Sequence, residues 1–131
     1  MKQRIAHVAI VVADYDDAID FYVKKVGFDL IEDTDLGDGK RWVLVRPTGA
    51  GEAATNLLLA KAGNAHQETF VGNQTGGRVG FFLYTDNIAR DVQAMQNNGV
   101  EFTQQPITHP YGTVAIFADL YGNLWDLIEP S

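Results

Sequence analysis

The sequence predicts an α+β fold made of two βαβββ modules, and three observations lead to this prediction. A strand, a capped helix and a second strand follow one another from His7, and the same order returns from Arg78. The chain closes with TVAIFADLYGNLWDLIEP, residues 113–130, in which two apolar runs flank a turn at Gly122. A repeated unit that leaves one face of its own sheet uncovered is expected to pack against its copy. An open, curved, eight-stranded mixed sheet around a groove is therefore expected.

The first module spans about residues 4–62. Its first strand is the apolar run from His7 to Ala13. A helix follows, with Asp14 as its N-cap and Gly27 as its stop. Strands are then predicted at 28–33, 41–46 and 56–60, with a turn at 34–40 and a Gly- and Ala-rich loop at 47–54.

The second module spans about residues 78–130, after a linker at about 63–77 that has no hydrophobic period. Its first strand leads to a helix with Asp86 as the N-cap and Gly99 as the stop. The strand at 100–103 precedes a loop at 104–112 that contains Pro106 and Pro110. The hairpin strands at 114–118 and 124–129 complete the module.

Composition limits the function. The 131 residues include 17 acidic and 10 basic side chains, for a net charge of −7, and the basic ones do not cluster. Nucleic acid and anionic membranes are therefore disfavoured as partners. The chain has no cysteine, so disulfides and thiolate ligands are excluded. No apolar run approaches the roughly 20 residues that span a bilayer, so we expect a single soluble domain in the cytoplasm.

Three sequence segments resemble the vicinal oxygen chelate superfamily. They are H-V-A-I at residues 7–10, D-F-Y at 20–22 and Y-G-N-L-W-D-L-I-E-P at 121–130. This superfamily includes glyoxalase I, extradiol dioxygenases, and bleomycin- and fosfomycin-resistance proteins. The resemblance covers essentially the whole chain and implies the fold described above and a homodimer. It leaves the chemistry open, because the scaffold hosts several reactions and also binding proteins.

The resemblance also implies where a metal would bind. In metal-using members each module gives two ligands, and those positions fall here on His7, Leu58, Arg78 and Asp126. Only His7 and Asp126 can coordinate a metal, since Leu has no donor atom and Arg has no lone pair. Asn56 shares the face of Leu58 but is a poor metal ligand. No metal or other cofactor is therefore expected, and glyoxalase I activity is disfavoured; a divalent ion is the alternative.

The same positions suggest a second use. We expect an ion pair of Arg78 with Asp126 in the groove, near His7, which would let the groove bind an anionic group without a metal. In the alternative interpretation the pair is structural and His7 is a core histidine. Strand alternation places Phe82 and Tyr84 on the face of Arg78. The candidate ligand-binding residues are therefore His7, Leu58, Arg78, Phe82, Tyr84 and Asp126.

Three functions follow from this site. The first is a metal-independent protein of the bleomycin-resistance kind, which binds an aromatic or amphipathic small molecule; the acidic net charge suits a cationic one. The second is a metal-dependent lyase, isomerase or dioxygenase. The third is a metal-free enzyme in which His7 or Asp126, the candidate catalytic residues, acts as a base. The residues do not separate the first from the third.

Overall fold

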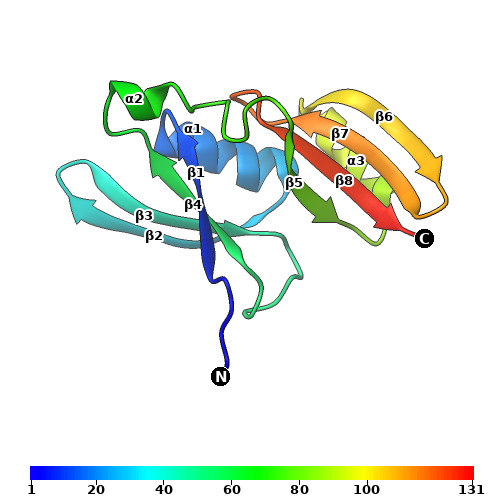
Figure 1. Ribbon diagram of the computed structural model, residues 1–131, viewed down its shortest axis with the longest axis horizontal. Coiled ribbons are helices and arrows are strands. Elements are labelled where there is room, and N and C mark those ends of the chain that lie inside the picture. The colour runs from blue at the N-terminus through cyan, green and yellow to red at the C-terminus, as the bar shows by residue number, and fades with distance from the viewer. The chain divides into compact units, whose positions relative to one another are not determined.

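The computed structural model describes residues 1–131 and divides into two compact units, Met1–Val71 and Gly72–Ser131. Each unit contains one mixed four-stranded sheet (Figure 1). The element order βαβββ occurs in both units, which confirms the predicted fold class. None of the helices has the length and apolar character that crossing a lipid bilayer requires.

In the first unit the sheet order is β1-β4-β3-β2, with β1 parallel to β4 and the other pairs antiparallel. The helix after β1 is capped by Asp14, whose Oδ2 accepts a hydrogen bond from the Asp17 amide at 2.8 Å, and it ends at Gly27 with φ 98°. Its second half is π-helical, which the sequence did not predict. The bounds are β1 His7–Val12, α1 Tyr15–Ile19, η1 Asp20–Val26, β2 Asp29–Gly37, β3 Lys40–Arg46, β4 Asn56–Lys61 and α2 Ala65–Glu68.

In the second unit the sheet order is β5-β8-β7-β6, with β5 parallel to β8. The predicted N-cap Asp86 is wrong: Asn87 caps α3, because its Oδ1 accepts from the Arg90 amide at 3.0 Å. Asp86 instead pairs with the Arg90 guanidinium at 2.8 Å. The bounds are β5 Val79–Tyr84, α3 Ile88–Asn97, β6 Glu101–His109, β7 Gly112–Ala118 and β8 Leu124–Pro130.

Strand β6 is longer than predicted, and the loop expected at 104–112 is wrong for most of its length. Pro106 lies where the β6–β7 register shifts, between the pairs Gln104–Ile116 and Ile107–Val114. Because β6 is an edge strand, a proline at such an irregularity costs no ladder hydrogen bond. The turn expected at 34–40 is also shorter than predicted, because β2 continues to Gly37.

The turn between β7 and β8 is held by the buried carboxylate of Asp119. Its Oδ1 accepts from the amides of Tyr121 and Asn123, and its Oδ2 accepts from Asn123 Nδ2 at 2.8 Å. Asn123 Oδ1 in turn accepts from the Gln74 amide at 3.0 Å. The end of the predicted linker is thereby fixed to this turn, at a point where Gly72 closely approaches Tyr121.

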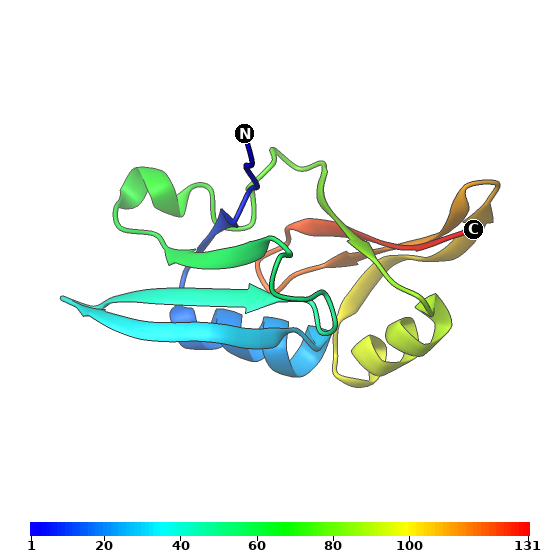
Figure 2. The same ribbon diagram turned by 90° about the horizontal axis from the view of Figure 1, so that it is seen from below.

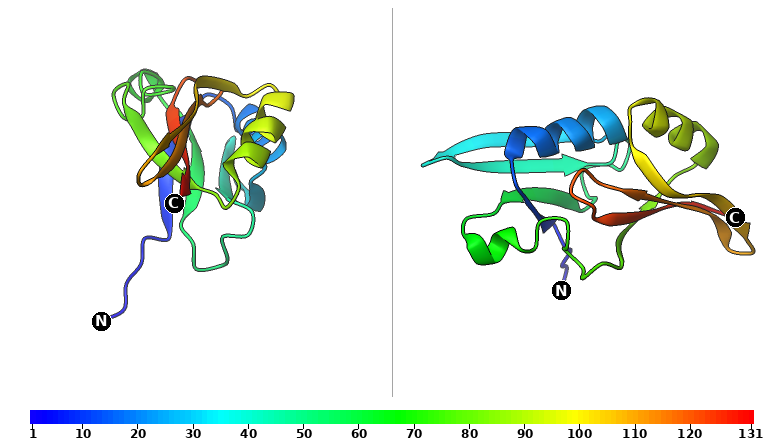
Figure 3. Two further views of the ribbon diagram at one scale, coloured as in Figure 1. Left: turned by 90° about the vertical axis from the view of Figure 1, so that its right-hand side faces the viewer. Right: turned by 90° about the horizontal axis from the view of Figure 1, so that it is seen from above.

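The core of each unit lies between its sheet and its helix. Figures 2 and 3 show α1 on one face of the first sheet and α3 on one face of the second. We call the opposite face of each sheet the open face; in the first unit the short helix α2 lies apart from α1, next to β1. The side chains buried on the helix-covered faces include Ile10, Val12, Val43, Val45, Leu59, Ala115, Phe117, Trp125 and Leu127.

Candidate functional site

The open face of the first unit carries His7 and Leu58. Strand pairing places His7 opposite Asn56 and Ala9 opposite Leu58, and directly paired residues share a face. Ile10 and Val12 alternate to the helix-covered side and are buried. The structure therefore brings His7 and Leu58 onto one surface, as the family resemblance implied.

His7 is held by two neighbours. Its Nδ1 lies 3.2 Å from Nδ2 of Asn56, and its ring meets the Trp42 ring edge to face at 5.8 Å. The His7 side chain is exposed, which argues against the core-histidine alternative. Asn56 is only 7% exposed, and its Oδ1 has no hydrogen-bond partner.

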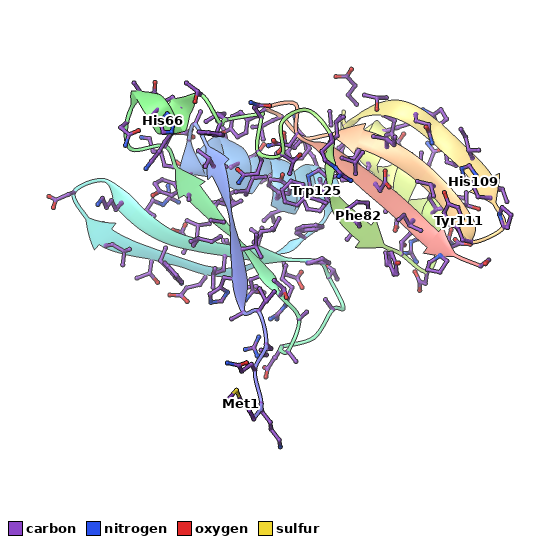
Figure 4. All side chains as sticks on the ribbon, viewed as in Figure 1. Met1, His66, Phe82, His109, Tyr111 and Trp125 are labelled. Carbon is purple, nitrogen blue, oxygen red and sulfur yellow. The ribbon has the colours of Figure 1, made fainter.

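The open face of the second unit carries two exposed aromatic rings and a carboxylate. Phe82 pairs with Asp126 and Tyr84 with Ile128, so Phe82 and Asp126 lie side by side on that face. Phe82, which is labelled in Figure 4, is 56% exposed, and Tyr84 is 70% exposed. Trp125 alternates to the covered side, as predicted, where it is buried and stacks with Phe81 and Phe117.

Asp126 is a half-buried carboxylate that makes no hydrogen bond and no ion pair. Its pKa is raised because burial disfavours the charged form, with no neighbouring cation to offset that effect. Such a carboxylate lacks the partner that buried charges normally have.

The predicted ion pair of Arg78 with Asp126 is wrong. The exposed Arg78 donates its Nε hydrogen to the carbonyl of Val79 at 3.0 Å. Arg78 precedes β5, and its own carbonyl accepts from the Thr75 hydroxyl at 2.7 Å. Because Arg78 lies outside the strand, alternation along β5 does not fix where its side chain points.

The donor set does not fit a divalent metal ion. Nowhere in the chain do three or more His, Asp or Glu side chains gather in a way that could hold one. In the first unit His7 has Asn56 and Leu58 as its open-face neighbours, and in the second Asp126 has Phe82. Amide, alkyl and aryl groups do not replace carboxylate or imidazole at a transition-metal site.

A separate polar hollow lies at the end of the β2–β3 hairpin. Its cation, Arg41, bonds Asp33 at 2.7 Å and Asp16 at 2.8 Å. The hydrogen bond from Arg41 lowers the pKa of Asp33. Arg41 is thereby paired with two carboxylates, whereas Asp35 accepts a hydrogen bond from the Gly37 amide, so the one cation of this hollow already has its partners. The hollow is lined by Asp33, Asp35, Gly37, Asp38, Gly39 and Arg41.

Sequence reasoning missed the roles of Trp42 and Asn56 beside His7. In the sequence Trp42 is not distinguished from the other aromatic residues of the strands, and only the pairing of β3 with β4 brings it near His7. The resemblance draws attention to Asn56 only as a poor metal ligand, whereas in the structure its amide contacts the imidazole. Strand alternation pointed to the correct face but not to the neighbouring strand.

Residues 4–127 match the family described as the Glyoxalase/Bleomycin resistance protein/Dioxygenase superfamily. An uncharacterized protein of Shewanella frigidimarina (strain NCIMB 400) is 55% identical over 130 residues, which are 98% of this chain and 95% of that protein. The uncharacterized protein YetH of Bacillus subtilis (strain 168) is 30% identical over 98% of this chain and 100% of its own length.

Solved structures show the same architecture. UcmS2 is 30% identical, with a TM-score of 0.84 and 98% of each chain covered. TnmS3, an antibiotic binding protein from Streptomyces sp. CB03234, is 33% identical, with a TM-score of 0.78 over 99% of this chain and 98% of that chain.

Proposed function

Because the chain belongs to the Glyoxalase/Bleomycin resistance protein/Dioxygenase superfamily, we propose that it binds a small aromatic molecule through the open faces of its sheets, without a metal. One observation carries the proposal: the unpartnered carboxylate of Asp126 lies beside the exposed ring of Phe82. Small-molecule sites typically combine apolar and aromatic walls with a few polar groups.

The ligand we propose is planar and carries a cationic or hydrogen-bond-donating group. Phe82 and Tyr84 offer ring faces for stacking. A cation beside Asp126 would offset the free-energy cost of removing water from the carboxylate. The net charge of −7 attracts cations to the protein as a whole. The similarity to TnmS3, which is an antibiotic binding protein, supports the binding of a small molecule.

The remaining candidates have distinct proposed roles. Leu58 contributes apolar contact on the first open face, next to His7. Arg78 has no acidic partner and is the one permanent cation of the set, so it would contact an oxygen of the ligand.

Isothermal titration calorimetry with two matched dyes tests the proposal. The dyes are 9-aminoacridine, a planar cation, and acridine, its less basic parent. We expect Asp126→Asn to weaken binding of 9-aminoacridine by about tenfold, as for loss of one charge-assisted hydrogen bond, and to leave acridine nearly unchanged. Phe82→Ala should weaken both dyes.

Asp38→Asn is the matched control for charge. Asp38 lies in the β2–β3 turn at φ 56°, a conformation that Asn tolerates, and its substitution removes the same unit of charge. Equal weakening by Asp38→Asn and Asp126→Asn would mean that only long-range charge matters. That result would remove Asp126 from the site.

We also propose that the chain forms a homodimer. Strands β1, β2, β5 and β6 are sheet edges within their units, and uncovered edges and exposed apolar side chains favour association. Sedimentation equilibrium should give twice the mass of 14.4 kDa at micromolar concentration. The monomer mass at every concentration would refute the dimer.

A further inference from the structure

The structure points to a second recognition element on the open face of the first unit. We propose that Asn56 is a positioning residue that holds His7 as an Nε2–H donor, so that this face selects a ligand with a carbonyl oxygen. This inference rests on the proposed small-molecule binding and names the polar group that the ligand carries.

The Asn56 amide faces His7 with its nitrogen. With Nδ2 facing His7, the atom left without a partner is the carbonyl oxygen Oδ1. The reverse orientation would bury an NH2 group with its hydrogens unpaired. Orphaned buried N–H groups are rarer than under-satisfied carbonyls, so the orientation with Nδ2 toward the ring is favoured.

This orientation of Asn56 determines the tautomer of the His7 imidazole. An amide NH2 can only donate, so Nδ1 of His7 must accept and carries no proton. In neutral imidazole the proton then lies on Nε2. Trp42 meets the ring at an interplanar angle of 82° and restricts its rotation. Since His7 is exposed, Nε2–H is the donor left for a ligand.

Burying the Asn56 side chain costs free energy of folding. A buried amide with an unpaired oxygen is less favourable than an apolar side chain of similar size. The backbone amide of Asn56 bonds the carbonyl of Ala6 at 2.9 Å whatever its side chain is. Strand β4 therefore does not need the Asn56 side chain, whereas His7 depends on that side chain for its orientation.

Two measurements test the proposal. The first, on the ligand-free protein at alkaline pH, uses imidazole ¹⁵N chemical shifts. We expect an unprotonated Nδ1 and a protonated Nε2 in the wild type. In Asn56→Asp the carboxylate should draw the proton to Nδ1. A protonated Nδ1 in the wild type would overturn the inference without touching the proposed binding function.

The second compares fluorenone with fluorene, which share a ring frame and differ by one carbonyl oxygen. At the same alkaline pH the wild type should prefer fluorenone about fivefold to tenfold, and Asn56→Asp should lose that preference. Asn56→Leu, which should melt no lower than the wild type, confirms that the amide is not needed for folding. An unchanged preference in Asn56→Asp, or binding of neither probe to the wild type, would overturn the inference. The proposed function itself fails only if 9-aminoacridine does not bind to the wild type.

Discussion

At the residue scale, Asp126 and Asp119 show two opposite uses of a carboxylate on the same hairpin. Asp119 is buried and its oxygens accept three hydrogen bonds, so it fixes the turn between β7 and β8. Asp126 is half-buried and has no partner, so its charged form is disfavoured. The first carboxylate stabilises the fold, and the second is available to a ligand.

The stability of an Asp126→Asn variant should depend on pH. The folded-state pKa of Asp126 is raised above its ordinary 3.8, so the folded state binds more protons than the unfolded state just above that value. The contribution of Asp126 to stability therefore falls as pH rises from 3.8 through the raised pKa. We expect the variant to gain in Tm over the wild type across this window and not below it. A Tm difference that is independent of pH would refute this account.

Gly72 should be far less tolerant of alanine than Gly76. Both have positive φ, 75° and 73°, so the backbone strain in Ala is nearly the same, about 1 kcal/mol. A Cβ on Gly72 would lie 2.0 Å from the carbonyl oxygen of Tyr121, whereas one on Gly76 meets nothing within 4 Å. Urea unfolding should show Gly72→Ala to be less stable by a further 1–3 kcal/mol or so. Equal losses would mean that the segment is not fixed to the turn.

At the element scale, local signals predicted the helices after β1 and β5, whereas α2 at Ala65–Glu68 lies within the predicted linker. Asp14 and Gly27 bound the first helix because caps and stops act within one turn. The extent of β6 past Pro106 was not predictable in this way, because it depends on β6 being an edge strand. The failed pair of Arg78 with Asp126 has a similar cause: alternation holds only within a strand.

The N-cap of α3 can be tested directly. Asn87→Ala removes the side-chain acceptor for the Arg90 amide and should cost about 1 kcal/mol of unfolding free energy. Asp86→Ala removes only an exposed pair with Arg90 and should destabilise the protein less than Asn87→Ala does. Chemical denaturation of both variants gives the comparison. A larger loss in Asp86→Ala would restore Asp86 as the cap.

At the scale of the whole molecule, the duplicated unit has one consequence for function. Each copy covers one face of its sheet with a helix and leaves the other face open (Figures 2 and 3). The open faces carry His7 with Asn56 in one unit and Phe82 with Asp126 in the other. The sequence predicted which residues lie on these faces, because strand alternation is local. It did not predict their partners, which depend on strand register.

That the open faces bind the ligand is a claim that a single titration can test. Backbone amide shifts are followed by ¹H–¹⁵N correlation spectra while 9-aminoacridine is added to the ¹⁵N-labelled protein. We expect the largest changes in β5 and β8, around Phe82 and Asp126, with further changes around His7. Changes confined to α1, α3 or the β2–β3 hairpin, with β5 and β8 unaffected, would contradict the claim.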